Sequence, residues 1–298
     1  MKIAITGGTG FVGSELTELL LQKGHDVYIL SRSKQGTKHG ITYVQWLSEN
    51  AHPEKQLEGV DAFVNLAGES INNGRWTEEQ KQKIYDSRMQ ATDELLRILN
   101  ALTVKPKVLV NASAIGIYPA STSTRYTEKS QEVGTDFLAR TVRDWELKAK
   151  SAEELQIRVA YGRFGIVLGK SEGALPLMAL PYKLFVGGPI GTGDNWMSWV
   201  HVKDVASALL FAIEQPINGP FNITAPHAKK MNDFGKTLAT VLKRPYYFPV
   251  PSFALKFALG EKSQLVIEGQ HVIPQVLLDE GYTFHFPNLE SALRAIYK

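Results

Sequence analysis

A glycine-rich turn near the start of the chain constrains the fold more than any other feature of the sequence. Residues 6–13 read TGGTGFVG; they follow a short apolar segment and precede one with helical periodicity. In that setting Gly7 permits a tight turn, Gly10 lets the backbone approach a pyrophosphate, and Gly13 allows the helix and strand to pack closely. Free amides at the start of the helix can bind the phosphates. The pattern predicts a dinucleotide-binding site rather than a glycine-rich turn without a ligand.

The end of the second predicted strand indicates which dinucleotide to expect. NAD enzymes usually place Asp or Glu about 20 residues beyond the glycine motif, where the carboxylate bonds the ribose hydroxyls. This chain instead has Ser31-Arg32-Ser33-Lys34. No carboxylate repels a 2′-phosphate there, and the planar guanidinium of Arg32 can hold one. The prediction is therefore NADP, with NAD less favoured and a solvated basic loop as the alternative interpretation.

Apolar runs alternate with helical segments over roughly the first two hundred residues, which is typical of a parallel sheet covered by helices. The predicted strands are Lys2–Thr6, Asp26–Leu30, Thr42–Gln45, Ala62–Leu66, Val108–Asn111 and Ile157–Ala160. The predicted helices are Phe11–Lys23, a long one from a capping box at Thr77 to about Leu102, and Asp136–Lys150. We therefore expect an α/β fold: a doubly wound parallel sheet of Rossmann type with a smaller, discontinuous C-terminal lobe.

The organisation changes after Gly162, where Gly, Pro and aromatic residues become denser and the predicted elements shorter. We expect a nucleotide-binding domain over residues 1–225, with residues 163–195 contributing to the second lobe, and a C-terminal domain over residues 226–298. Two segments are expected to return to the large sheet: Trp199–Val202, followed by a helix after Asp204, and Phe221–Thr224. From residue 249 the sequence predicts short helices broken at residues 260, 269 and 274, and a last helix near Asn288–Tyr297.

Composition excludes several classes of site. The chain has no cysteine, which rules out disulfides, thiolate catalysis and Cys-ligated metals and suits a reducing cytosol. Its seven histidines lack metal-ligand spacing, so no metal site is expected. The net charge of +3 is spread evenly, which predicts no affinity for nucleic acid or for an anionic membrane. We expect a soluble cytoplasmic protein whose partner is a small-molecule substrate, and a homodimer is left open.

Two further strand ends complete the predicted cofactor site. Small residues after the fourth strand leave room for the adenosine side of the dinucleotide, and Ser113 ends the fifth strand beside the expected nicotinamide. The predicted cofactor-binding residues are Gly7, Thr9, Gly10, Phe11, Val12, Gly13, Ser31, Arg32, Asn65, Leu66, Ala67, Gly68, Asn111 and Ala112.

Taken together, these motifs resemble those of the extended short-chain dehydrogenases/reductases, the group that includes the sugar-nucleotide epimerases and dehydratases. More narrowly, the chain resembles an atypical branch of epimerase family proteins with a small C-terminal helical domain. The resemblance covers nearly the whole chain. Beyond the glycine turn, the matching segments are residues 65–68, 74–77, 87–88, 113–118, 144–146, 163–169, 173–176, 199–204 and 249–297.

The resemblance fails at the catalytic pair. Enzymes of this superfamily use Ser with Tyr-x-x-x-Lys, in which the tyrosine is the general acid/base and the lysine lowers its pKa. Here the two slots hold Leu138 and Val142 or, shifted by one residue, Phe137 and Thr141. None of these side chains exchanges a proton as that pair does, so the resemblance leaves Ser113 without its usual partners.

Other side chains are candidates for the missing roles. Tyr118 is the first candidate proton donor because it leaves the same strand end as Ser113, although it could instead pack the cleft wall. Tyr126 is a weaker candidate because Ser130, not Lys, follows it by four residues. The substrate candidates are Glu69, Arg75, Trp76, Ser198 and His201. Trp76 is equally suited to anchor the start of the long helix. His201 and Asp204 are better suited to a hydrogen bond that joins the two lobes.

The sequence therefore predicts an NADP-binding oxidoreductase or epimerase-like enzyme that acts on an unidentified small metabolite through an unusual proton relay. Fold-level similarity supports this function. The absent Tyr/Lys pair supports an alternative: a catalytically silent NADP-binding protein that senses redox state or scaffolds a partner.

Overall fold

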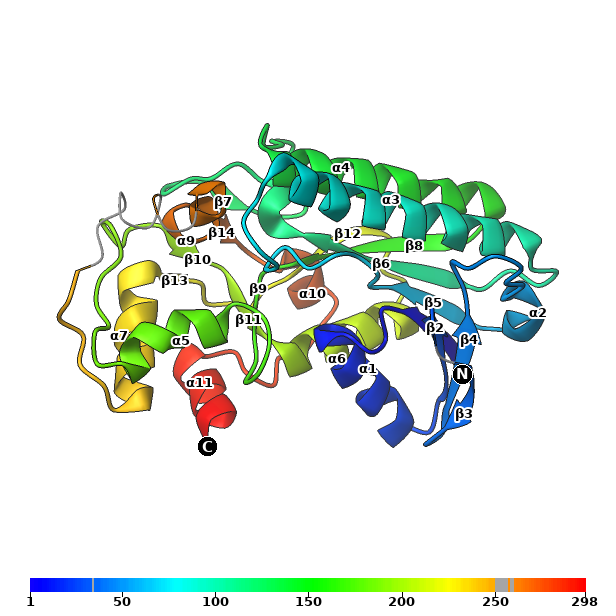
Figure 1. Ribbon diagram of the computed structural model, residues 1–298, viewed down its shortest axis with the longest axis horizontal. Helices are drawn as coiled ribbons and strands as arrows, with labels where there is room; N and C mark the ends of the chain where they lie inside the picture. Colours follow the sequence, from blue (N-terminus) through cyan, green and yellow to red (C-terminus); the bar gives the residue numbers. More distant parts are fainter. Residues whose placement is uncertain (34, 250–256, 258–259) are drawn as a thin grey trace.

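The computed structural model describes residues 1–33, 35–249, 257 and 260–298, and its centre is an eight-stranded sheet (Figure 1). The strand order is β12-β8-β6-β5-β1-β2-β4-β3, with β3 antiparallel to β4 and the other neighbours parallel. The strands are β1 (Lys2–Thr6), β2 (Asp26–Ser31), β3 (Gly36–Lys38), β4 (Ile41–Gln45), β5 (Ala62–Asn65), β6 (Val108–Ala114), β8 (Arg158–Phe164) and β12 (Gly219–Ile223).

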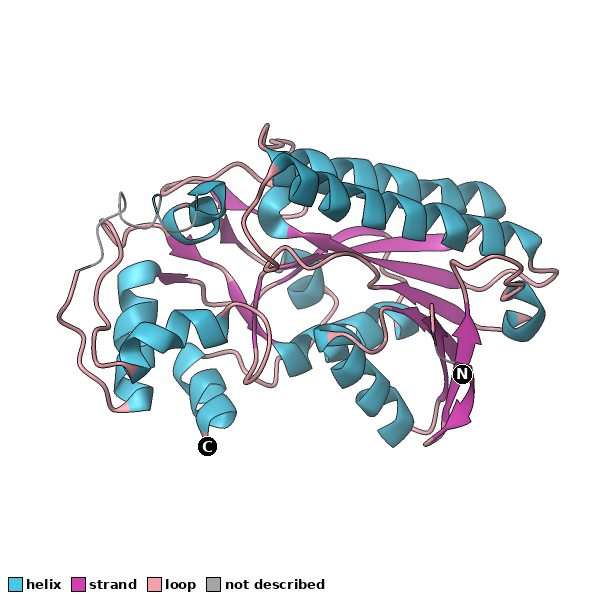
Figure 2. Ribbon diagram, in the orientation of Figure 1, coloured by secondary structure: helices cyan, strands magenta, loops and turns pink. Residues whose placement is uncertain are grey.

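Helices cover both faces of this sheet, as Figures 1 and 2 show. On one face lie α1 (Phe11–Gln22) and α6 (Val202–Glu214), and on the other lie α3 (Glu78–Ala101) and α4 (Phe137–Lys150), with the short α2 (Glu54–Leu57) near the sheet edge. Alternate residues of β1 serve the two layers: Ile3 and Ile5 pack with α1 and α6, and Ala4 packs with α3. This arrangement confirms the predicted doubly wound fold.

Side-chain caps define the starts of α3 and α4. Thr77 Oγ1 accepts a hydrogen bond from the Gln80 amide at 3.2 Å, and Asp136 Oδ1 accepts one from the Ala139 amide at 3.0 Å. The reciprocal half of the capping box predicted at Thr77 does not form. The Thr77 amide bonds the Arg75 carbonyl instead, and Gln80 Nε2 has no partner among the described residues.

The second lobe is built from three separated parts of the chain. Its helices are α5 (Leu175–Lys183), α7 (Met231–Leu242), α9 (Gln264–Ile267) and α11 (Leu289–Tyr297), whereas α10 (Gln275–Asp279) packs against β12 in the core of the large sheet. Its small strand pairs are β9 (Ile166–Leu168) with β11 (Trp199–His201), β10 (Trp196–Met197) with β13 (Lys229–Lys230), and β7 (Arg125–Tyr126) with β14 (His271–Val272). Around the fully buried Trp199, α5, α7 and α11 share one apolar core.

Several predictions about this region are wrong in detail. The segment Trp199–Val202 does not return to the large sheet, because β11 pairs with β9 in a sheet of its own, and α6 already begins at Val202. Only β12 rejoins the large sheet, beside β8. The edge strand β3 was not predicted because its residues are polar and exposed. Gly260 begins a 3-10 turn rather than ending a helix, and the helix expected between residues 249 and 260 lies mostly outside the described residues.

Candidate functional site

The glycine turn leaves an open position at Gly10. Gly7 has a φ of +67°, and Gly13 lies against the Gly7 carbonyl so closely that no side chain fits there. In contrast, a Cβ on Gly10 would meet only the Gly7 carbonyl oxygen, at 3.3 Å. The protein's own packing therefore explains Gly7 and Gly13, whereas Gly10 keeps clear a space that a ligand can use.

The start of α1 suits an anion. Its N-cap residue, Gly10, provides no side-chain cap, and the first turn carries no acidic residue. The first amides of a helix have no partner within it, so those at residues 11–13 can donate to a phosphate. The side chain of Phe11 turns away from this role and packs against Gly169 and Gly173 of the second lobe.

At the end of β2, Arg32 is exposed and makes no hydrogen bond or ion pair with any residue that the structure describes. The Ser31 hydroxyl accepts the Ser33 amide at 3.3 Å, and the Ser31 carbonyl accepts the Trp46 amide. These bonds hold the strand end from which Arg32 projects. Its guanidinium is thus free to meet the 2′-phosphate expected from the sequence.

The side chains of Asn65 and Asn111 are bonded inside the protein. Both are fully buried, and Asn65 Nδ2 donates to Asn111 Oδ1 at 2.7 Å and to Thr92 Oγ1 at 3.2 Å. Asn65 Oδ1 accepts the Thr6 hydroxyl at 2.6 Å. The Thr6 hydroxyl oxygen in turn accepts the amides of residues 66 and 67. We interpret the two asparagines as positioning the loop of residues 66–68, rather than as side-chain contacts to a cofactor.

Arg88 is a candidate site residue that the sequence analysis did not single out. Its guanidinium lies over Gly68 and stands 5.1 Å from the ring centroid of Trp145, and one of its nitrogens donates to the carbonyls of Glu69 and Ile84. Burial lowers the pKa of Arg88 to about 10. The remaining N–H groups bond no described residue, so a buried cation is available beside the predicted cofactor wall. One signal could have revealed it: Arg88 falls on the apolar stripe of α3, four residues after Ile84.

A hydrogen-bonded chain of polar residues joins β6, β8 and α4. Ser113 and Arg163 are register partners on the two strands, so their side chains project together toward α4. Ser113 Oγ donates to Glu146 Oε1 at 2.5 Å. Arg163 grips the same carboxylate with two N–H bonds of 2.8 Å, from Nε to Oε1 and from Nη2 to Oε2. The Arg163 and Glu146 side chains are only 9% and 13% exposed.

Arg163 stays charged in this environment. Burial acts to lower its pKa, but the ion pair with Glu146 outweighs burial and raises the pKa above the usual value. A bidentate pair of this kind holds the carboxylate in one orientation. Glu146 therefore presents the oxygen Oε1 to Ser113 in a defined geometry.

Tyr118 is poorly placed to donate a proton to a substrate. It is 1% exposed, and its hydroxyl oxygen accepts from Arg163 Nη1 at 2.9 Å. Its single proton faces two acceptors, Asn222 Oδ1 at 2.9 Å and the Thr127 carbonyl at 3.1 Å. Burial raises the pKa of Tyr118 although Arg163 lies beside it. This geometry favours the packing role that the sequence left open, with the Tyr118 ring stacked on Tyr126.

Apolar side chains fill the two slots on α4 that hold Tyr and Lys in the superfamily. Leu138 faces Gly116, and Val142 is buried with Ile115, Ile117 and Tyr118. One turn further along the same helix face is Glu146, four residues beyond Val142. The side chain of α4 that contacts Ser113 is therefore the carboxylate of Glu146, which lies one turn beyond Val142, the position of the superfamily's lysine.

The five substrate candidates do not converge on one point. Trp76 is buried, donates its indole N–H to the Ile71 carbonyl and packs edge-on against Phe137, which is the anchoring role. Glu69 accepts a hydrogen bond from Asn73 at 2.7 Å, and Arg75 is exposed in the loop before α3. Ser198 is buried and bonds the backbone of Gln270 and Val272.

His201 and Asp204 hold the lobes together. His201 Nδ1 accepts the Lys203 amide at 3.1 Å, its ring packs on Phe286, and burial lowers its pKa to about 4. The fully buried Asp204 accepts the amides of His285 and Phe286 at 2.7 and 3.0 Å. The Asp204 bonds are interlobe hydrogen bonds of the kind expected at this junction, whereas the His201 bond is a local cap of α6 and only its ring reaches the C-terminal segment. Neither side chain faces Ser113 in any of the contacts described.

Within the described ranges, no three His, Asp or Glu side chains gather as metal ligands would. None of the helices that the structure describes is both long and apolar enough to cross a membrane.

Comparison with known proteins finds relatives over the whole chain. A family model described as the NAD dependent epimerase/dehydratase family matches residues 3–224, and a domain of unknown function, DUF1731, matches residues 250–296. The chain is 49% identical over 295 residues to epimerase family protein YfhF of Bacillus subtilis, covering 98% of this chain and 97% of that one. It is 46% identical over 293 residues to epimerase family protein SH2119 of Staphylococcus haemolyticus, with the same coverage.

Solved structures are similar over the same length. Human epimerase family protein SDR39U1, solved with NADPH, is 34% identical, with a TM-score of 0.87 and 99% coverage of both chains. UDP-glucose 4-epimerase of Thermus thermophilus, solved with NAD, is 18% identical with a TM-score of 0.79, covering 99% of this chain and 97% of that one. At that identity the second likeness concerns the fold alone.

Proposed function

The chain belongs to the NAD dependent epimerase/dehydratase family, and from this premise we propose that it is an NADP-dependent oxidoreductase or epimerase-like enzyme acting on a small metabolite with a hydroxyl or carbonyl group. The cofactor part of the proposal is supported by the open space at Gly10 and the uncapped start of α1. Preference for NADP is supported by the exposed Arg32 and by the NADPH in the human relative's structure. Arg88 offers a further cationic group for the dinucleotide.

The observation that carries the proposed chemistry is the contact between Ser113 and Glu146. When bound, a nicotinamide dinucleotide supplies or accepts the hydride. In the oxidative direction Ser113 Oγ accepts the proton of the substrate hydroxyl while it gives its own proton to Glu146 Oε1. The substrate thus loses one hydride and one proton and becomes a carbonyl. In the reductive direction a protonated Glu146 returns the proton through Ser113.

Arg163 is a positioning residue in this scheme. Its two bonds to Glu146 orient Oε1 toward Ser113, and its third, to the hydroxyl of the buried Tyr118, holds the guanidinium in place. Glu146 thereby replaces Tyr118, the first candidate from the sequence, as the proton-exchanging group.

NADPH oxidation against pooled sugars, aldehydes, ketones and quinones tests the proposal. With a substrate in hand, Ser113→Ala and Glu146→Gln should each lower kcat by about two orders of magnitude with little change in NADPH affinity. Glu154→Gln, an exposed change on the turn after α4, is the matched control and should retain full rate. Full activity in both site variants would refute the relay.

A catalytically silent NADP-binding protein remains the second candidate, because Leu138 and Val142 close the usual catalytic slots and Ser113 is only 2% exposed. Micromolar NADPH binding without turnover in any pool would favour this function over the enzyme.

A further inference from the structure

Exposed apolar side chains gather at one end of the second lobe. Leu177 and Leu180 of α5 and Leu184, just beyond it, follow one another at helical spacing and are exposed. The next residue, Phe185, is also exposed. Tyr247 and Phe248 lie alongside, because both of their amides donate to the Gly187 carbonyl. We call these six residues the apolar patch; it lies near the ends of α5 and α7, at the end of the molecule opposite β3 (Figure 1).

The backbone holds one of these aromatic rings outward at a conformational cost. Phe185 has a φ of +64°, which bulky residues rarely adopt. Its amide donates to the Tyr182 carbonyl, and the next amide donates to that of Pro181, so the end of α5 keeps this conformation. The ring nevertheless stays 56% exposed, with the Arg244 guanidinium 4.5 Å from its centroid. These two bonds form a Schellman cap, which accounts for the positive φ of Phe185 and leaves its ring at the surface.

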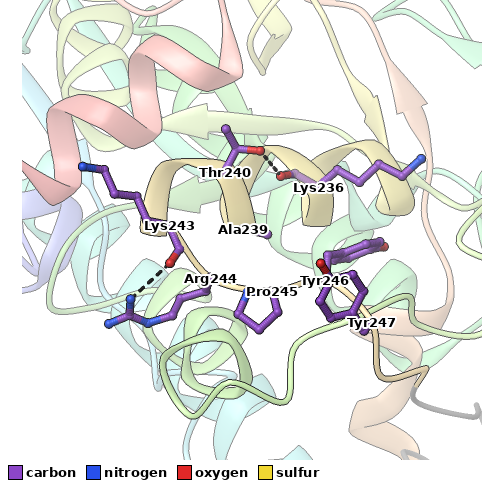
Figure 3. Close-up of a pocket in the computed structure, with 8 residues that line it drawn as sticks. All are labelled: Lys236, Ala239, Thr240, Lys243, Arg244, Pro245, Tyr246 and Tyr247. Carbon is purple, nitrogen blue, oxygen red and sulfur yellow. Dashed lines mark hydrogen bonds between the residues drawn. The ribbon is translucent and has the colours of Figure 1, made fainter.

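Positive charge exceeds negative charge beside the patch. Residues 173–193 and 236–249 contain no Asp or Glu, and one acid, the exposed Asp233, lies one turn before Lys236 on α7. Exposed Lys236, Lys243 and Arg244 border a shallow hollow of about 480 Å³ beside Tyr247 (Figure 3). Figure 3 shows the two lysines extending in opposite directions from α7 instead of converging on one point. This spread matches an array of anionic groups better than a single phosphate.

We propose that the apolar patch and these three cations dock the protein on an anionic phospholipid bilayer. Exposed Leu and aromatic side chains enter the boundary between headgroups and acyl chains, while Lys and Arg meet anionic headgroups. A second copy of the chain fits less well, because a symmetric contact would bring the same cations together. The even spread of charge along the sequence predicts no such affinity; folding brings residues 173–193 and 236–249 together at this end of the lobe. The inference is independent of the proposed function.

Sedimentation with vesicles tests this proposal on the full chain. Vesicles of mixed phosphatidylcholine and phosphatidylglycerol should pellet the protein, pure phosphatidylcholine should do so weakly, and salt should reduce binding. Lys243→Gln combined with Arg244→Gln should lower the partition coefficient about thirtyfold. Phe185→Ser combined with Phe248→Ser should lower it at least about tenfold.

Matched controls come from the first domain. Val104→Ser with Leu147→Ser removes two side chains of similar exposure, and Lys107→Gln with Lys150→Gln removes two exposed charges; neither pair should change vesicle binding. An unchanged urea unfolding midpoint in every variant shows that the fold is intact. The proposal would be overturned if the protein bound both vesicle types equally, or if the control variants lost as much binding as the patch variants. It would also be overturned if the unmodified protein bound no vesicles but formed a concentration-dependent dimer that the patch variants abolished.

Discussion

Glu146→Gln, Arg163→Met and their combination test whether the polar residues between α4 and the sheet act as one unit. Glutamine keeps the shape of Glu146 and can still accept from Ser113, but it removes the charge opposite Arg163. Arg163 then remains buried with the Tyr118 hydroxyl as its other side-chain partner. The converse change leaves the Glu146 carboxylate bonded to Ser113 alone.

The expected magnitudes follow from burial and from the two 2.8 Å bonds. Removing one partner of a buried ion pair costs about 3–5 kcal/mol. Because glutamine retains one hydrogen bond, we expect about 2–3 kcal/mol for Glu146→Gln and about 3–4 kcal/mol for Arg163→Met. The double variant contains no uncompensated charge and should cost about 3–4 kcal/mol, so the coupling energy is about 2–3 kcal/mol.

Urea unfolding of the ligand-free protein, followed by tryptophan fluorescence and by circular dichroism, measures this cycle. The control is the same cycle on the Glu290–Arg294 pair, which is about half exposed and should couple by at most about 0.5 kcal/mol. A coupling energy no larger than that of the control would refute the interpretation that Arg163 holds Glu146 in place.

Three further predictions concern the cofactor and the lobe junction. Arg32→Ala should reduce the ratio of NADPH to NADH affinity about tenfold or more, and equal calorimetric affinities in the unmodified protein would contradict this. His201 resists protonation when folded, since burial lowers its pKa to about 4 whereas the unfolded chain titrates near 6.5. Unfolding free energy should therefore fall as the pH drops from about 6.5 toward 4, by up to about 1.4 kcal/mol per pH unit. The His201→Asn variant, whose amide oxygen can still cap α6, should show a smaller decrease of unfolding free energy between pH 6.5 and 4 in denaturation curves. An unchanged pH dependence would contradict this role of His201. Asp204→Asn should destabilise the protein by about 2–4 kcal/mol, because one amide can no longer satisfy both backbone donors; a change within the error of thermal unfolding would exclude the role assigned to this carboxylate.

Sequence patterns predicted the first domain more accurately than the second. Its strands and helices alternate regularly, so each apolar run has one plausible neighbour in a doubly wound sheet. Past residue 164 every described strand except β12 is two or three residues long, and short apolar runs do not specify their partners. That is why β11 was assigned to the large sheet although it pairs with β9.

The candidate site was predictable only in part. Ser113 and the glycine turn were found because strand ends and turns depend on local sequence. The roles of Glu146 and Arg163 were not found, although their residues were noticed as matching segments. Their meeting requires the register of β6 with β8 and the crossing of α4 above both strands. No linear spacing marks that contact.

By itself, the sequence determined the dinucleotide turn, the helix caps at Thr77 and Asp136, the absence of the usual Tyr/Lys pair and the fold class. These features rest on interactions within a few residues or on the period of apolar side chains. Only the tertiary structure decided that Tyr118 is buried and bonded, that Glu146 meets Ser113, and that Tyr247 and Phe248 lie beside the segment that follows α5. The physical reason is that burial and charge compensation depend on residues far apart in the chain, which folding alone brings within bonding distance.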